Sequence, residues 1–400
     1  MSETFDVLVV GAGLVGLGTA RALLRGGGSL AVVEAEDRVA AHQSGNNSGV
    51  LHAGLYYRPG SEKARLCARG REQMVAFCDE HGVRWQRTGK LVVATRPEQV
   101  SALDELQRRG AANGLGGIER LGPDGLRSHE PHVRGVEGLW VPATGIVDFK
   151  AVAAALQGEI ERAGGSVSLR APVTAVRRDG DAFVVRVGPR DVRARFLVNC
   201  AGLQADRVAR LCGVQPPARI VPFRGEYKEL RPQARDLVRG LIYPVPDPRF
   251  PFLGVHFTRR VDGSVEAGPN AVLALSRHGY RWRDVSVRDL CGYVANGGFW
   301  RMARRYWRTG FAEVGRSLSH GAFTRALQEL VPEVAADDLL PGGSGVRAQA
   351  LRRDGTLADD FVFGEGPGSL HVLSAPSPAA TACLAIGEEI AAKVAASGKP

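Results

Sequence analysis

Three glycines near the start of the chain have the spacing of a dinucleotide-binding loop. Gly11, Gly13 and Gly16 form a G-x-G-x-x-G pattern between an apolar run at 5–10 and a predicted helix at 14–25. In such a loop the first glycine permits a tight turn, the second lets the backbone approach a pyrophosphate, and the third lets helix and strand pack closely. The N-terminus of the helix then favours the phosphate charge. The pattern therefore predicts a bound dinucleotide.

An acidic residue ends the second apolar run of the same unit. The run at 30–33 is followed by Glu34, eighteen residues after Gly16. A carboxylate at this point accepts a hydrogen bond from a ribose hydroxyl. A glycine-rich turn without a ligand would not explain Glu34, so the acid favours a dinucleotide site. Residues 1–34 are thus predicted to form a complete strand–helix–strand unit of a parallel sheet.

The segments that follow Glu34 favour FAD over NAD. An NAD enzyme would continue with a further strand and helix, whereas this chain enters a polar, glycine-rich loop at 41–54. Far downstream, an apolar strand at 195–200 runs directly into Ala201 and Gly202. Flavoproteins place small-residue turns of this kind near the adenosine. We therefore expect FAD as the cofactor.

Six separated blocks, spread over almost the whole chain, carry a family resemblance. They are His42–Gly54, Ile220–Tyr227, Ile242–Thr258, Gly268–Leu273, Gly345–Ala350 and Ala375–Thr381. Together they resemble the L-2-hydroxyglutarate oxidase/dehydrogenase family of D-amino-acid-oxidase-like flavoproteins. The resemblance implies FAD-dependent oxidation of L-2-hydroxyglutarate to 2-oxoglutarate, with O2 or a membrane quinone as electron acceptor. At Asn46 and Ser374 we expect the family to have His and Asn.

The dinucleotide fingerprint, the small-residue turns and the resemblance together give an expected set of FAD contacts. These are Gly11, Gly13, Leu14, Val15, Gly16, Glu34, Gln43, Ser44, Asn47, Ser48, Gly49, Val173, Ala201, Gly202, Gly345, Val346, Ser377, Pro378, Ala379 and Thr381. Residues 376–381 are also predicted to open the last helix. The N-terminus of that helix would stabilise negative charge on the reduced flavin, although a helix that simply starts with proline is the alternative interpretation.

Two histidines are candidates for the catalytic base. Oxidation of a 2-hydroxy acid moves the hydroxyl proton to a base and a hydride to flavin N5, and a base that is neutral at working pH suits His. His52 follows the polar loop and is expected at the flavin as base or hydrogen-bond partner. His256, in an alternating strand at 253–258, is the rival base. A structural role remains the alternative for each.

Substrate carboxylates are best bound by arginine, because its guanidinium donates two parallel hydrogen bonds. Most of the 46 arginines must lie on the surface, so only those inside the resemblance blocks are candidates. These are Arg224 and Arg347, and we expect Arg347 beside the flavin. Tyr243 and Asn270 complete the expected catalytic set, with framework roles as the alternative.

The composition gives weaker indications. The formal net charge is +10, but only six of the 52 basic residues are Lys, and this Arg bias is typical of a GC-rich genome. An acidic substrate or a membrane surface is the other explanation of the charge. The six cysteines are scattered without a CxxC pair, so we predict neither a metal site nor a disulfide framework. They are Cys67, Cys78, Cys200, Cys212, Cys291 and Cys383.

The expected location is the cytoplasm. The chain begins almost directly with a predicted strand, and no apolar run reaches ~18 residues. Residues 299–308 alternate aromatic and cationic side chains, as an interfacial helix that hands electrons to a quinone would do. A helix docked on its own domain is the more common cause of this pattern. Peripheral contact with the inner face of the membrane is therefore left open.

The predicted fold class is α/β, with two domains. Residues 216–275 contain short apolar stretches broken by prolines, which indicates an antiparallel sheet, and a helical stretch follows at 284–332. The chain then returns to a strand at 370–374 and a helix at 379–396. We predict a discontinuous Rossmann-like FAD-binding domain over 1–85, 145–215 and 340–400. An α+β substrate-binding domain is predicted over 86–144 and 216–339.

Two other functions stay open. One keeps the fold but oxidises an amine or amino acid, as glycine and sarcosine oxidases do. The other is a basic protein that binds RNA or anionic lipid, with any flavin purely structural. The chain has no RNA-binding motif with interleaved aromatics, so we expect no nucleic-acid partner. The favoured partners are a small dicarboxylate substrate and O2 or a quinone.

Overall fold

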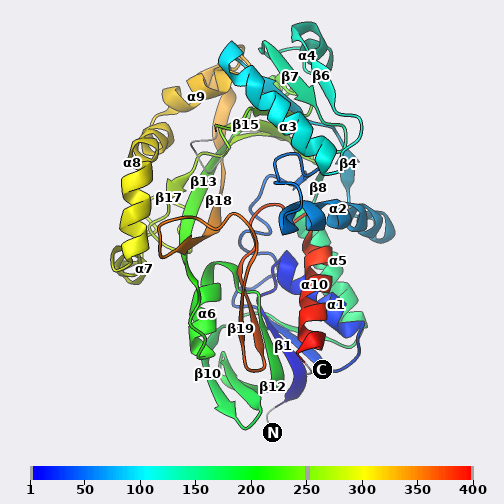
Figure 1. Cartoon of the computed structure of the whole chain (residues 1–400), viewed down its shortest axis with the longest axis vertical. Coiled ribbons are helices and arrows are strands. Elements are labelled where there is room, and N and C mark those ends of the chain that lie inside the picture. The colour runs from blue at the N-terminus through cyan, green and yellow to red at the C-terminus, as the bar shows by residue number, and fades with distance from the viewer. Residues whose placement is uncertain (1–2, 248–252, 398–400) are drawn as a thin grey trace.

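The computed structural model describes residues 3–247 and 253–397, whose strands form three sheets (Figure 1). The eight-stranded sheet contains β1 (Thr4–Val10), β2 (Leu30–Val33), β9 (Ser166–Ser168), β10 (Val173–Asp179), β11 (Ala182–Val187), β12 (Arg190–Asn199), β19 (Val362–Gly366) and β20 (Ser369–Ser374). Its centre is parallel, in the order β20-β12-β1-β2-β9. The hairpins β10–β11 and β19–β20 are antiparallel.

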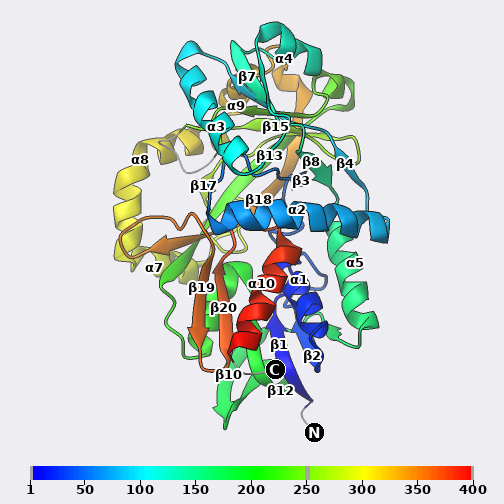
Figure 2. The same cartoon turned by 45° about the vertical axis from the view of Figure 1, so that its right-hand side comes forward.

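Helices cover both faces of this sheet. One face packs against α1 (Leu14–Leu24), α5 (Phe149–Arg162) and α10 (Cys383–Ala396), and the other against α6 (Ala205–Leu211). Strands buried on both faces must be apolar, as β2 is throughout and β1 is over its buried part, Val7–Val10. The helix α2 (Glu62–His81) contacts α10. It lies between the half of the molecule that contains this sheet and the second half, which contains the other large sheet (Figure 2).

Two glycines allow α1 and α10 to pack closely. A Cβ at Gly18 would lie 2.4 Å from the carbonyl oxygen of Cys383, and one at Gly387 would lie 2.3 Å from that of Gly18. Side chains at either position would force the helices apart. This contact holds the last helix against the first βαβ unit. It thereby brings residues 374–380 to the edge of the sheet at which β1 ends.

The second, nine-stranded sheet is mostly antiparallel and forms the upper half of Figure 1. Its strands are β5 (Leu91–Ala94), β6 (Glu119–Leu121), β7 (Glu137–Trp140), β13 (Ala218–Leu230), β14 (Leu241–Pro244), β15 (His256–Arg259), β16 (Val265–Gly268), β17 (Val272–Leu273) and β18 (Leu339–Arg352). Only β14 and β5 pair in parallel among the described strands of this sheet. A small third sheet contains β3 (Val50–Leu51), β8 (Gly145–Val147) and β4 (Trp85–Arg87).

The predicted fold class is confirmed, including the antiparallel sheet expected over 216–275. The domain limits stay a prediction. In the structure, Leu339–Arg352 pairs with β13 in the second sheet, although residues 340–352 were assigned to the FAD-binding domain. Residues 248–252, in the middle of one resemblance block, lie outside the described residues.

Five helices belong to the second half: α3 (Val100–Ala112), α4 (Pro123–His129), α7 (Val287–Val294), α8 (Gly297–Leu318) and α9 (His320–Gln328). The stretch predicted to be helical at 284–332 is therefore three helices. Asn296 accepts a hydrogen bond from the backbone N–H of Gly298, and Ser319 accepts one from that of Ala322. These side chains cap α8 and α9 and so interrupt a single helix. Short 3-10 turns occur at Pro97–Gln99, Gly202–Gln204, Pro232–Leu237 and Ala336–Asp338.

The start of the last helix was predicted too early. The helix begins at Cys383 and not at residue 379. Before it, the backbone N–H of Ala379 donates to Pro376, and that of Ala382 donates to Pro378. Pro378 disfavours the helical conformation at the preceding residue, Ser377, so this segment forms turns and not the first turn of a helix. The proposed helix N-terminus at residues 376–381 is thus replaced by a turn.

Candidate functional site

A cavity of about 1380 Å³ begins at the carboxyl ends of the central parallel strands and reaches the second sheet. Gly11, Glu34 and Ala201 line it where β1, β2 and β12 end. At the far end it is lined by Tyr243 and His256. Ligands of open α/β sheets bind at this edge. The volume exceeds that of common small-molecule pockets, roughly 300–1,000 Å³, and suits a dinucleotide together with a second small molecule.

The glycine-rich loop forms an open cradle. Gly11 has φ +103°, in the region that favours glycine, and Gly13 precedes the first turn of α1. No acidic side chain lies in that turn and its N-cap residue, Gly13, has no side chain, so its N-terminus faces the cavity without an anion from the turn itself. Ser44 accepts a hydrogen bond from the backbone N–H of Leu14 at 2.9 Å, which ties the polar loop to the cradle. A phosphate group fits such a helix N-terminus.

Glu34 lies beside this cradle, at the position from which a carboxylate contacts the ribose of a dinucleotide. Its carboxylate accepts hydrogen bonds from the backbone N–H groups of Ala12, at 2.8 Å, and Glu36, at 3.0 Å. These bonds fix the carboxylate at the wall of the cavity. Val173 and Ala201 line the same part of the cavity. The cradle and the fixed carboxylate fit the pyrophosphate and ribose of FAD.

Almost all of the predicted FAD contacts line the cavity. Gly49 and Thr381 are the two that do not. The Thr381 hydroxyl accepts from the backbone N–H of His52 and donates to the carbonyl oxygen of Val50. The backbone N–H of Gly49 donates to the side chain of Asn47. Both residues therefore support the backbone of the loop whose other residues line the cavity.

Adding one methyl group at Gly16 is expected to remove the cofactor. A Cβ there would lie 1.9 Å from the carbonyl oxygen of Gly11, so Gly16→Ala must displace the cradle. We expect purified Gly16→Ala to contain less than about a tenth of the FAD of the wild type, measured by flavin absorbance per protein, because close approach of the backbone to phosphate is lost. Gly158→Ala is the control, since a Cβ at 158 has no neighbour within 4 Å. Full FAD content in Gly16→Ala would refute this placement of the cofactor.

At the other end of the cavity lie both candidate bases. The Nδ1 of His256 donates to the carbonyl oxygen of Gly254 at 2.8 Å, which leaves the Nε2 lone pair able to accept a proton. His52 Nε2 lies 3.2 Å from the hydroxyl of Ser377. The pKa of each imidazole is lowered to about 3, mainly by burial and in part by the positive charge of Lys90. Both histidines are therefore neutral at physiological pH.

Tyr243, Tyr227 and Arg347 complete this end of the cavity. The ring of Tyr243 stacks on the imidazole of His256 with centroids 3.8 Å apart. Arg347, on β18, hydrogen-bonds the hydroxyl of Tyr227 and contributes to the lowered pKa of His256. Burial raises the pKa of both tyrosines, so their hydroxyls stay protonated. The arrangement offers one guanidinium and two neutral imidazoles to an anionic substrate.

Two residues of the predicted catalytic set lie elsewhere. Arg224 is fully buried outside the cavity lining, where it pairs with Glu226 at 2.9 Å and lies over the ring of Trp282. Asn270 is also absent from the lining and hydrogen-bonds both the backbone and the carboxylate of Glu226. The side chain of Arg224 projects away from the site because alternate residues of a strand face opposite sides. The structure therefore does not bring these two residues to the others.

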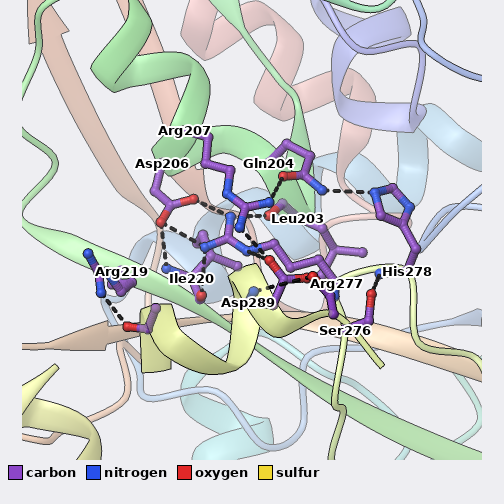
Figure 3. A network of polar contacts seen from close by, with 12 residues as sticks. Leu203, Gln204, Asp206, Arg207, Arg219, Ile220, Ser276, Arg277, His278 and Asp289 are labelled. Carbon is purple, nitrogen blue, oxygen red and sulfur yellow. Dashed lines mark hydrogen bonds and ion pairs between the residues drawn. The ribbon is translucent and has the colours of Figure 1, made fainter. Parts of the chain in front are cut away.

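A network of ion pairs supports one wall of the cavity (Figure 3). Arg277 is buried and pairs with Asp206 of α6, while Arg207 pairs with Asp289 of α7. Asp289 also accepts from the backbone N–H of Arg277. Because these pairs join α6 to α7, they hold the two halves together beside the cofactor. Part of the Arg excess thus has a structural role.

Sequence reasoning missed two residues at this site. Tyr227 lies inside a quoted block but was not selected, although it lines the cavity and bonds Arg347. Lys90 was not noticed at all, yet it is 1% exposed and changes the pKa of both histidines. One feature of the sequence could have identified Lys90. In a chain with six lysines and 46 arginines, a lysine directly before the apolar run at 91–94 is unusual.

Comparison with protein families gives a match over nearly the whole chain. Residues 6–393 match the DAO family model, described as FAD dependent oxidoreductase. An L-2-hydroxyglutarate dehydrogenase of Indibacter alkaliphilus is 47% identical over 96% of this chain and 97% of its own. The mitochondrial L-2-hydroxyglutarate dehydrogenase of Homo sapiens is 42% identical over 98% of this chain and 89% of its own. The enzyme of that name from Escherichia coli K12 is 42% identical, covering 98% and 93%.

Solved structures show the same fold at lower identity. The FAD-bound L-alpha-glycerophosphate oxidase of Mycoplasma pneumoniae superposes with a TM-score of 0.81 at 21% identity, covering 98% of this chain and 95% of that one. The glycine oxidase of Geobacillus kaustophilus gives 0.73 at 19%, covering 99% and 95%. At these identities the likeness concerns the fold.

Proposed function

The chain belongs to the family of FAD-dependent oxidoreductases, and from this premise we propose that it oxidises L-2-hydroxyglutarate to 2-oxoglutarate. The relatives that share 42–47% of its sequence over nearly their full length carry that activity in their names. The observation that carries the proposal is the continuity of one cavity, from the FAD cradle to Arg347 and the two neutral histidines. FAD is the cofactor, and the substrate is a small hydroxy acid.

The residues at the substrate end have complementary roles in this reaction. Bound FAD would accept a hydride at N5. We assign Arg347 to the carboxylate next to the reacting carbon, since a guanidinium binds a carboxylate through two hydrogen bonds. His256 takes the hydroxyl proton on Nε2, because its Nδ1 proton is held by Gly254. His52, whose Nε2 lies beside the hydroxyl of Ser377, would hydrogen-bond the reacting group.

A turnover assay with an artificial electron acceptor tests the proposal. We expect dye reduction with L-2-hydroxyglutarate and at least ~100-fold less with D-2-hydroxyglutarate, glycine, sarcosine or L-proline. Formation of 2-oxoglutarate should match the dye reduced. Turnover with amino acids alone would instead assign the chain to amine oxidation. The relatives favour the hydroxy acid, since the solved amine oxidases share the fold at under 25% identity.

We also propose that α7 and α8 contact an anionic membrane, where a quinone could accept the electrons. Among described residues, seven of the ten exposed large apolar side chains lie between 285 and 318. They are Val285, Val287, Val294, Trp300, Trp307, Phe311 and Leu318. Arg304, Arg305 and Arg308 are exposed on the same helix. Apolar side chains combined with arginines suit an interfacial helix. No described helix is both long and apolar enough to span a bilayer.

Removing two of these side chains should release the protein from vesicles. Trp307 and Phe311 are 53% and 74% exposed. Burying a large apolar side chain contributes ~1.5–3 kcal/mol, so Trp307→Ser with Phe311→Ser should weaken binding to phosphatidylglycerol vesicles by about 100-fold or more. Val136→Ser, which changes an exposed residue next to β7 and outside α7 and α8, is the control. If the wild type fails to float with such vesicles at low salt, the membrane proposal is wrong and O2 becomes the favoured acceptor.

A further inference from the structure

Lys90 is a buried lysine without a carboxylate partner. It directly precedes β5 and is 1% exposed. No described acidic side chain forms an ion pair with it, and the causes that act on its pKa are burial and the thiol of Cys67. Lysines are almost never fully buried unless paired, because an uncompensated buried charge costs several kcal/mol. Burial lowers the pKa of Lys90 to about 7, so the amine readily loses its proton in the empty site, and an anionic ligand nearby would favour the protonated form.

Two aromatic rings lie close to the ammonium, which is not itself part of the cavity lining. Its Nζ lies 4.4 Å from the centre of the Tyr56 ring and 4.9 Å from that of Tyr243. Tyr243 lines the cavity and stacks on His256, so the charge lies directly behind this part of the wall. Cation–π contacts contribute ~0.5–2 kcal/mol, less than an uncompensated buried charge costs. The rings orient the ammonium but do not neutralise it.

Two cations therefore act on the same end of the cavity. Both Lys90 and Arg347 lower the pKa of His256, and Lys90 also lowers that of His52. Both histidines are neutral, so they contribute no opposing charge. Lys90 has no described acidic partner, so a second carboxylate of the substrate could compensate its charge while Arg347 binds the first.

We propose that Lys90 supplies the positive charge that recognises the second carboxylate of the substrate, and so selects dicarboxylic over monocarboxylic 2-hydroxy acids. This inference rests on the proposed function, because it concerns the substrate of the same site. Arg347 would bind the carboxylate beside the reacting carbon. Lys90, on a flexible four-carbon side chain behind Tyr243, would act on the carboxylate at the opposite end of the five-carbon substrate.

The pKa of Lys90 also predicts how dicarboxylate binding depends on pH. Burial lowers the pKa of Lys90 to about 7 in the empty site. Since only the protonated amine attracts the second carboxylate, affinity should be constant below pH 7 and fall up to about tenfold per unit above it. The neighbouring groups do not titrate there. His52 and His256 have a pKa of about 3, that of Cys67 is raised to about 12, and those of Tyr56 and Tyr243 are raised by burial.

The test compares two ligands in the FAD-loaded protein and in its Lys90→Met variant. Glutarate and pentanoate have the same five-carbon chain and differ in one carboxylate, and their binding is measured by the change in flavin absorbance. Lys90→Met should weaken glutarate binding by about 100-fold or more, while pentanoate binding changes less than about threefold. The pH dependence of glutarate binding above pH 7 should disappear. Kinetically, the preference for L-2-hydroxyglutarate over L-2-hydroxypentanoate should fall by the same factor.

A second lysine, Lys63, is the control for the loss of a positive charge at the cavity. Lys63, unlike Lys90, lines the cavity itself and pairs with Asp359 at 3.0 Å, so Lys63→Met should keep the preference for glutarate. Lys90→Met should fold, because methionine is apolar and similar in length. If Lys90→Met retains the preference, or loses affinity for both ligands equally, the proposal fails. Glutarate binding is measured without any turnover of the enzyme. A wild type that binds glutarate but does not oxidise L-2-hydroxyglutarate would refute the proposed function and leave the role of Lys90 testable.

Discussion

Arg347→Met is expected to lower kcat/KM for L-2-hydroxyglutarate by about 10³-fold. Truncating one partner of a buried, hydrogen-bonded charge pair costs ~2–5 kcal/mol, and here the carboxylate would enter the cavity without its guanidinium. The variant should keep its FAD, because the cradle at Gly11–Gly16 lies at the other end of the cavity. Steady-state kinetics combined with the flavin content of the purified protein would measure both quantities.

Two other arginines serve as controls for Arg347. Arg352 lies on the same strand and is exposed, so Arg352→Met should be close to the wild type. Arg224 is buried with Glu226 outside the cavity, so Arg224→Met should destabilise the fold, by ~3–5 kcal/mol, with no specific effect on substrate binding. Wild-type kinetics in Arg347→Met would contradict the assignment of this residue to the substrate carboxylate.

His256→Asn is expected to lower kcat by about 10²- to 10⁴-fold, the usual contribution of a general base. FAD binding should persist, because His256 lies on β15 at the end of the cavity away from the cradle. His52→Asn should have a smaller effect on kcat, since His52 is assigned to a hydrogen bond and not to proton transfer. If His52→Asn lowers kcat more than His256→Asn does, the two roles must be exchanged.

The pH profile gives an independent check on the base. The pKa of His256 is lowered to about 3, mainly by burial. Its neutral form, which accepts the proton, is therefore present throughout the range above about pH 4. We expect kcat/KM of the wild type to be flat between pH 5 and 7. A rise in kcat/KM with pH that is centred near 6.5, the ordinary pKa of His, would mean that the base is a solvated histidine.

Local patterns allowed most of the cofactor site to be predicted. The glycines of the loop and Glu34 each act through backbone geometry or a hydrogen bond within one βαβ unit, and their spacing is therefore visible in the sequence. The same holds for Ala201 and Gly202, which follow an apolar strand. The antiparallel sheet was also predictable, because prolines and short apolar runs exclude further strand–helix units.

The substrate end depends on contacts that the sequence does not show. Arg224 and Arg347 lie on two strands that pair with each other, and both stand in quoted blocks, but only one faces the cavity. Which of the two arginines lines the cavity depends on the side of the sheet that its side chain faces. Lys90 reaches the histidines from β5, across the parallel pairing of β5 with β14. Residues so far apart in sequence are brought together by tertiary structure alone.

The most direct test of the proposed function is anaerobic reduction of the bound flavin. We expect L-2-hydroxyglutarate to bleach the flavin absorbance of the wild type, with one 2-oxoglutarate formed per flavin. The D isomer and amino acids should leave the spectrum unchanged. A flavin that stays oxidised with L-2-hydroxyglutarate, or that is bleached by amino acids instead, would contradict the proposed function.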